Sequence, residues 1–197
     1  MRGLLGEIEN VDDEVIFNYE VRVRGDIGLE LFRNEEVGPL MTRSSSIVIL
    51  WIGHKSLRSV MDFEKRAKFM DFIMEILNLL AYAGKFIYVL GLPLKFRCLQ
   101  DAQEPDWVFN YGFCNNARNL SRRIQNWCNR NPKCRFIKLP KELYEIDDSV
   151  TGNTSPNRYY RVGVESQILN LRREGYQLIA ARVYNCIQED VFLDRFV

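Results

Sequence analysis

Three short apolar runs, separated by segments of helix length, constrain the fold of this chain more than any other feature. They are Ile47–Ile52 (IVILWI), Lys85–Pro93 (KFIYVLGLP) and Cys134–Pro140 (CRFIKLP). A run without polar alternation is typical of a strand covered on both faces, as in a parallel sheet. Strands separated by helices form right-handed βαβ units, so the sequence predicts an α/β fold. We expect a three-layer α/β/α sandwich with a mainly parallel, flavodoxin-like sheet.

The helix-length segments carry apolar side chains at helical spacing. One stripe recurs at steps of four and three residues, which predicts a core-facing helix that Gly84 ends: Phe63, Ala67, Met70, Met74, Leu77 and Ala81. Ser59 and Asp62 resemble a capping box for it. We expect a second helix through Ala117–Trp127, capped by Asn115 or Asn116, and a last helix over about 172–187. Near the start, Val15–Val23 is typical of a strand.

Composition limits the class of protein. The 197 residues are 47% hydrophobic, which suits a single domain over 1–197 with a sizeable core. There are 27 Lys and Arg against 26 Asp and Glu, so the overall charge does not favour binding to nucleic acid or to an acidic membrane. No apolar run approaches the length of a membrane span, and the amino-terminal segment lacks an apolar signal core. We expect a cytoplasmic or nuclear protein with no membrane partner.

The five cysteines are an odd number with irregular spacing, so reduced, buried thiols are a better interpretation than disulfides. The segment CNNARNLSRRIQNWCNRNPKC holds three of them without a C-x-x-C pair or a nearby histidine. We therefore expect no metal. We expect no cofactor either.

The order of motifs resembles the SGNH hydrolase family, the GDSL-type esterases. ILWIGHKSL is similar to the family block that ends in Gly-x-Asn-Asp-Leu, and NLRREGYQLIAARV is similar to the block in which His-Leu-Asn precedes Gly-Tyr. The resemblance implies the α/β/α fold. In active members it also implies a serine nucleophile after the first strand, an Asp-x-x-His pair, and an oxyanion hole that includes a glycine and an asparagine.

This sequence departs from the family at those positions. Lys55 stands where the resemblance places the oxyanion asparagine, and Ser56 where the next aspartate would be. Asn170 takes the place of the catalytic histidine and Gln167 that of its aspartate. Asparagine has no titratable nitrogen, so it cannot be a general base near neutral pH.

The strand that precedes the nucleophile in the family also has no counterpart in this sequence. The segment MRGLLGEI is similar to the helix that follows it in the family. We therefore expect either a rearranged sheet or a strand supplied by another chain. The resemblance leaves a vestigial pocket, with these residues: Gly25 (or Gly28 in its place), Gly53, His54, Lys55 and Asn170.

The leading hypothesis is therefore a non-catalytic pseudo-hydrolase domain that acts as a protein-interaction or scaffolding module, with either a protein partner or a second copy of the chain. A residual carboxylic ester hydrolase with relocated residues, such as His54 with Ser56, stays open. So does a nucleic-acid-associated role for the segment Arg118–Lys141, which has no acidic residue. Its candidate basic binding face comprises Arg118, Arg122, Arg123, Arg130 and Lys133. The alternative is a solvated helix face.

Overall fold

A three-stranded parallel sheet forms the centre of the described part of the chain. The computed structural model describes residues 4–8, 17–21, 32–52, 63–92, 96–99, 106–109, 111–143, 159–162 and 169–195. The sheet has the order β3 (Ile47–Leu50), β4 (Phe86–Leu90) and β7 (Cys134–Ile137). Both pairings are parallel, with Ile47 opposite Phe86 and Ile87 opposite Cys134. The predicted α/β class is confirmed, because the three apolar runs are the three strands.

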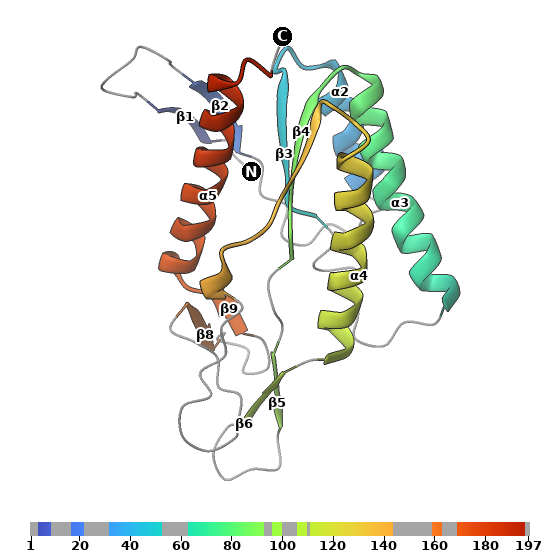
Figure 1. Cartoon of the computed structure of the whole chain (residues 1–197). Coiled ribbons are helices and arrows are strands. Elements are labelled where there is room, and N and C mark those ends of the chain that lie inside the picture. Colours follow the sequence, from blue (N-terminus) through green and yellow to red (C-terminus); the bar gives the residue numbers. More distant parts are fainter. Residues whose placement is uncertain are drawn as a thin grey trace.

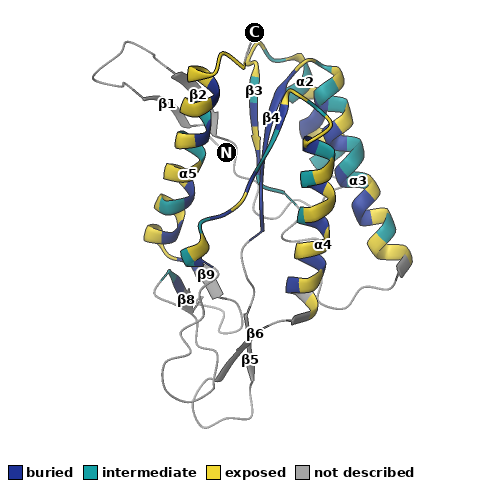
Figure 2. Ribbon diagram, viewed as in Figure 1, coloured by how far each residue is buried: buried dark blue, intermediate teal, exposed yellow. Residues whose placement is uncertain are grey.

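Long helices lie on both sides of this sheet (Figure 1). The helices α3 (Phe63–Tyr82) and α4 (Tyr111–Cys128) are on one side, and α5 (Arg173–Phe192) is on the other. A short helical segment, η1 (Arg33–Val37) and α2 (Gly38–Thr42), packs against α3. The buried residues of α3 and α4 face the sheet, whereas their exposed residues face outward (Figure 2).

The larger core cluster joins α3 and α4 to one face of β3 and β4. Its side chains with no exposed surface include Ile73, Ile76, Leu77, Leu80 and Ile87. The predicted α3 stripe is core, since Met70 and Leu77 are both buried. Gly84 follows the helix with a φ of 76°, a left-handed conformation that glycine adopts without strain.

One part of the strand prediction is wrong: the run at Ile47–Ile52 is not covered on both faces. Val48 and Leu50 are buried, but Ile49 is 48% exposed. The physical reason is position, because β3 lies at an edge of the described sheet while β4 lies in its centre. Every residue of β4 is buried, as expected for a strand with a neighbour on each side.

The small strands form antiparallel pairs. They are β1 (Leu4–Ile8) with β2 (Phe17–Val21), β5 (Phe96–Leu99) with β6 (Asp106–Phe109), and β8 (Tyr160–Val162) with β9 (Leu169–Leu171). The expectation of a helix in MRGLLGEI is wrong, because Leu4–Ile8 is a strand. A helix of this length would be marginal in water, whereas pairing with β2 satisfies the backbone groups of Leu4–Ile8.

A buried ionic cluster holds α5 against the sheet. Asp190 of α5 has no exposed surface, and its Oδ2 accepts a hydrogen bond of 2.7 Å from the hydroxyl of Tyr88 in β4. Its Oδ1 forms ion pairs with Arg135 at 2.9 Å and Arg195 at 3.3 Å, without hydrogen-bond geometry. Arg135 also donates to the backbone oxygen of Cys186. No pattern in the sequence indicated this cluster.

The amino-terminal end of α5 lies near the end of β3. The ring of Trp51, just after β3, meets the ring of Tyr176 edge-on, with centroids 6.0 Å apart. Gly175 is buried, and a Cβ there would lie only 3.0 Å from Leu171 Cδ2 and 3.2 Å from the backbone oxygen of Tyr159. The Gly-Tyr pair of the sequence therefore permits a close approach of α5 to β8 and β9.

Among the described residues, no helix combines the length and apolar character needed to cross a membrane.

Candidate functional site

A polar cleft lies between the amino-terminal halves of α3 and α4. Its volume is about 550 Å³, and its lining residues are Arg66, Gly112, Asn115, Asn116, Arg118, Asn119 and Arg122. Arg66 lies in the first turn of α3, and the other residues lie on α4. The cleft is therefore lined by arginines and amides and has no carboxylate in its lining.

The local sequence explains this arrangement. Cys114, Ala117, Leu120 and Ile124 turn into the core, and Asn116 is buried beside them. The exposed residues of this part of the helix are Asn115, Arg118, Asn119, Arg122 and Arg123. Asn115 and Asn119 are one turn apart, and so are Arg118 and Arg122, which places each pair on one helix surface. The expectation that Asn115 or Asn116 caps the helix is wrong, because α4 already begins at Tyr111 and both asparagines lie inside it.

The electrostatics of α4 are one-sided. The helix carries Arg118, Arg122 and Arg123 and no acidic residue. All three arginines are exposed. Arg118 and Arg122 are about 6 Å apart along the axis, within one Debye length at physiological salt, so an anion at the cleft interacts with both.

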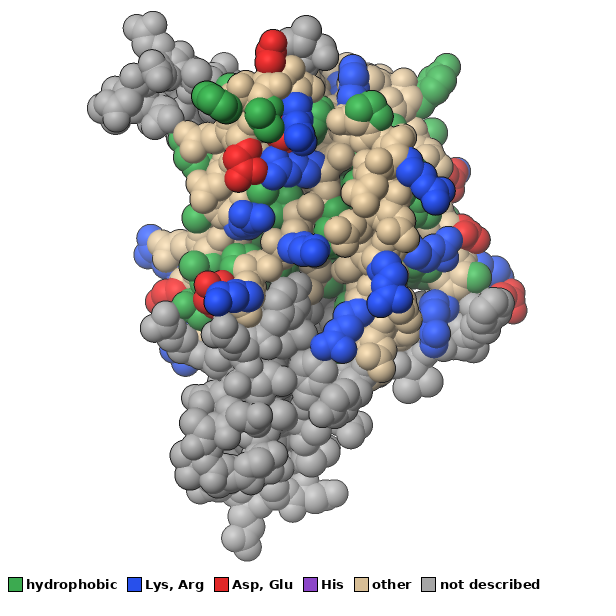
Figure 3. Space-filling view, in the orientation of Figure 1, with side chains coloured by type: hydrophobic (Ala, Val, Ile, Leu, Met, Phe, Trp, Pro, Cys, Tyr) green, Lys and Arg blue, Asp and Glu red, His purple; other side chains and the backbone are tan. Residues whose placement is uncertain are grey.

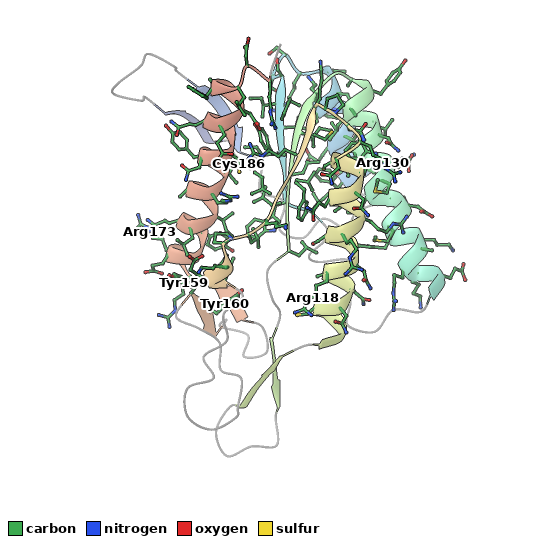
Figure 4. The ribbon with its side chains drawn as sticks, in the orientation of Figure 1. Arg118, Arg130, Tyr159, Tyr160, Arg173 and Cys186 are labelled. Carbon is green, nitrogen blue, oxygen red and sulfur yellow. The ribbon has the colours of Figure 1, made fainter. Side chains whose placement is uncertain are left out.

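The basic face continues beyond the cleft. Arg130 and Lys133, in the turn between α4 and β7, are exposed as well. Figure 4 shows Arg118 on the lower part of α4 and Arg130 near its upper, carboxyl-terminal end, and Figure 3 shows Lys and Arg side chains gathered over this helix. The structure thus brings together the five predicted basic residues on α4 and the turn after it. We call this surface the α4 basic face: Arg118, Arg122, Arg123, Arg130 and Lys133.

Arg135 belongs elsewhere, although it lies in the same basic segment of the sequence. Its guanidinium is bonded to Glu189 and paired with Asp190 of α5. It therefore contributes to the attachment of α5 and not to the α4 basic face.

A second, smaller pocket adjoins the cleft. It has a volume of about 180 Å³ and shares Arg66, Asn116 and Asn119 with the cleft. Its remaining lining residues are Ala67, Phe69, Met70 and Arg123. The polar cleft thus borders a smaller hollow that is lined on α3 by Ala67, Phe69 and Met70.

The buried thiols are unsuited to nucleophilic chemistry. Burial raises the pKa of Cys128 to about 12, with a further contribution from nearby Cys134, and burial raises the pKa of Cys134 to about 11. A thiol is nucleophilic as the thiolate, which is scarce at neutral pH for such groups. The cysteines whose side chains the structure describes are Cys114, Cys128, Cys134 and Cys186; all four are buried and outside any disulfide, as expected for small apolar side chains. The described residues contain no group of metal-ligating side chains.

The positions of the vestigial pocket and of the degenerate catalytic residues fall mostly outside the described residues. Those outside are Gly25, Gly28, Gly53, His54, Lys55, Ser56 and Gln167. Asn170 lies in β9, where its backbone is opposite Arg161 of β8. The roles given to these positions stay predictions.

Five members of the cleft lining were not among the predicted site residues: Arg66, Gly112, Asn115, Asn116 and Asn119. Asn115 or Asn116 was expected to be a helix cap, and the other three were given no functional role. A usable signal was present in the sequence: the four-residue spacing of both pairs on a helix without acids. The contribution of α3 depends on helix packing, which this signal does not report.

Comparisons of this chain with protein-family models, with curated proteins and with solved structures found no match.

Proposed function

We propose that this protein is a non-catalytic binding domain and that the α4 basic face binds nucleic acid. The observation that carries the proposal is the cleft between α3 and α4, where Arg66, Arg118 and Arg122 line one polar hollow. Arginine binds phosphate well because its planar guanidinium donates two parallel hydrogen bonds. The proposal therefore favours nucleic-acid binding over the protein-interaction or scaffolding module that the sequence alone favoured.

The local distribution of charge supports this choice despite the neutral chain. The formal net charge is +1, so the whole molecule does not attract polyanions strongly. Along α4, however, no acidic side chain offsets the arginines. From Arg118 to the end of α4 at Cys128 the face runs about 15 Å at the helical rise per residue, and Arg130 and Lys133 extend it into the next turn, so it spans several phosphates of a nucleic-acid strand.

The finer description of the fold is part of the same proposal. Helices on both sides of a parallel sheet support a three-layer α/β/α sandwich of flavodoxin-like type. The motif order supports a degenerate SGNH-hydrolase-like domain, in which Asn170 replaces the base. A scaffold of this kind offers a sheet edge and helix surfaces for binding without requiring catalysis.

Fluorescence anisotropy with a labelled oligothymidine of about 20 nucleotides tests the proposal at low salt. The double variant Arg118→Ala/Arg122→Ala should weaken binding about tenfold or more, since each arginine supplies charge-assisted hydrogen bonds. The matched control is Arg173→Ala/Arg182→Ala, which removes two exposed arginines from α5 on the other side of the sheet. No binding at low salt, or equal losses in the two variants, would contradict the proposal.

A second candidate function, self-association, is favoured by an apolar patch at the end of α5. Phe192 is 89% exposed, and its neighbours Val191 and Leu193 are also exposed. Adjacent exposed apolar side chains are typical of contact surfaces between proteins. Sedimentation velocity should show a dimer that Phe192→Ser/Leu193→Ser converts to a monomer. A wild-type protein that remains monomeric at high concentration would exclude this candidate.

A further inference from the structure

The polar cleft and the apolar hollow beside it adjoin each other, and we call the two together the depression. Arg66, Asn116 and Asn119 line both parts, so the two parts meet at these three residues. The larger part presents Arg118 and Arg122 with Asn115, and the smaller part presents Ala67, Phe69 and Met70. A ligand that fits both parts has an anionic group at one end and a largely apolar group at the other.

We infer that this depression holds one nucleotide unit of a single strand, with the phosphate in the arginine-lined cleft and the base in the hollow on α3. The inference rests on the proposed function and specifies the ligand of the same surface. The cleft of about 550 Å³ lies within the usual range for ligand pockets, and the hollow of about 180 Å³ has room for one ring system.

The lining residues match the parts of a nucleotide. Arginine donates to phosphate oxygens, and the side chains of Phe69 and Met70 offer the base an apolar contact. Asn119 borders both parts. An asparagine amide both donates and accepts hydrogen bonds, which suits the mixed edge of a base.

The depression also discriminates between nucleic-acid forms. A base inside a duplex is stacked and paired, so it can enter the hollow only after it is extruded at a cost. A base in a single strand is already accessible, and proteins commonly bind it by contact with its flat face. The depression therefore selects single strands over duplexes.

Isothermal titration of the full chain with adenosine monophosphate, adenosine and inorganic phosphate tests the inference. Adenosine monophosphate should bind about tenfold more tightly than inorganic phosphate, because the base adds contacts in the hollow. Adenosine should bind more weakly than the monophosphate, since it lacks the anionic group. Equal affinities for the monophosphate and for inorganic phosphate would overturn the inference.

Two variants locate the base. Ala67→Leu narrows the hollow and should remove the preference for the monophosphate while leaving the affinity for inorganic phosphate unchanged. Asn119→Ala should reduce the preference, whereas Asn126→Ala, an exposed asparagine of α4 outside both linings, should not. Circular dichroism of each variant verifies the fold. A preference that survives Ala67→Leu would overturn the assignment of the base.

The outcomes separate this inference from the proposed function. If the oligonucleotide binds through Arg118 and Arg122 but the monophosphate has no advantage over phosphate, the inference fails and the proposed function stands. If a duplex binds more tightly than the single strand of the same sequence, the inference fails in the same way. If neither the oligonucleotide nor the monophosphate binds, both fail.

Discussion

The attachment of α5 to the sheet gives a prediction about stability that is independent of any ligand. Tyr88→Phe removes the hydroxyl that donates a hydrogen bond of 2.7 Å to Asp190 Oδ2. The ring remains, and so does its contact with Phe86 at a centroid distance of 5.2 Å. The substitution therefore isolates one hydrogen bond to a carboxylate, between two side chains that have no exposed surface.

The expected loss is about 1.5–3 kcal/mol of unfolding free energy, the usual contribution of a hydrogen bond to a charged group. Asp190 keeps its ion pairs with Arg135 and Arg195, so its charge is not left alone and larger losses are not expected. In a chain of this size the loss corresponds to a fall in Tm of roughly 3–12 °C.

Urea denaturation followed by circular dichroism measures the loss, with Tyr82→Phe as the matched control. Tyr82 is 88% exposed, so the control should change the free energy by less than about 0.5 kcal/mol. If Tyr88→Phe is as neutral as Tyr82→Phe, the hydrogen bond to Asp190 does not stabilise α5 and the reasoning is refuted.

Three further predictions concern the thiols, the Gly-Tyr pair and the sheet edge. Unfolded thiols ionise near pH 9, whereas burial raises the pKa of Cys128 to about 12 and that of Cys134 to about 11, so the folded state keeps protons that the unfolded state loses. The unfolding free energy should therefore fall as pH rises from about 9 to 11, by up to ~1.4 kcal/mol per pH unit for each thiol, and less steeply in Cys134→Ala; parallel profiles in urea titrations would contradict this. Gly175→Ala should destabilise by about 1–2 kcal/mol through its close contacts, whereas Gly38→Ala, with open space around it, should not; equal thermal shifts would count against the tight approach at Gly175. Ile87→Ala should cost about 2–5 kcal/mol and the half-exposed Ile49→Ala clearly less, and similar losses in chemical denaturation would argue against β3 as an edge strand.

The central strands and the α3 helix could be predicted from the sequence because their patterns are local. An apolar run such as Phe86–Leu90 and the stripe through Met70 and Leu77 report burial directly. The exposure of Ile49 could not be predicted, because an edge strand and a central strand have the same apolar pattern and differ only in their neighbours.

The candidate site, likewise, could be predicted from the sequence only in part. The basic residues of α4 stood out in the sequence because they are close together and lack acids. The separation of Arg135 from them required the structure, since β7 directs that side chain to α5. The cleft itself depends on how α3 lies beside α4, and no periodicity along one helix specifies that.

The salt dependence of oligonucleotide binding tests the central claim most directly. For a single strand, the slope of log K against log salt is about −0.7 for each phosphate neutralised. The account predicts that Arg118→Ala/Arg122→Ala makes the slope shallower by about 1.4, while Arg173→Ala/Arg182→Ala leaves it unchanged. An unchanged slope in the α4 variant, with binding intact, would show that the α4 basic face is not where nucleic acid binds.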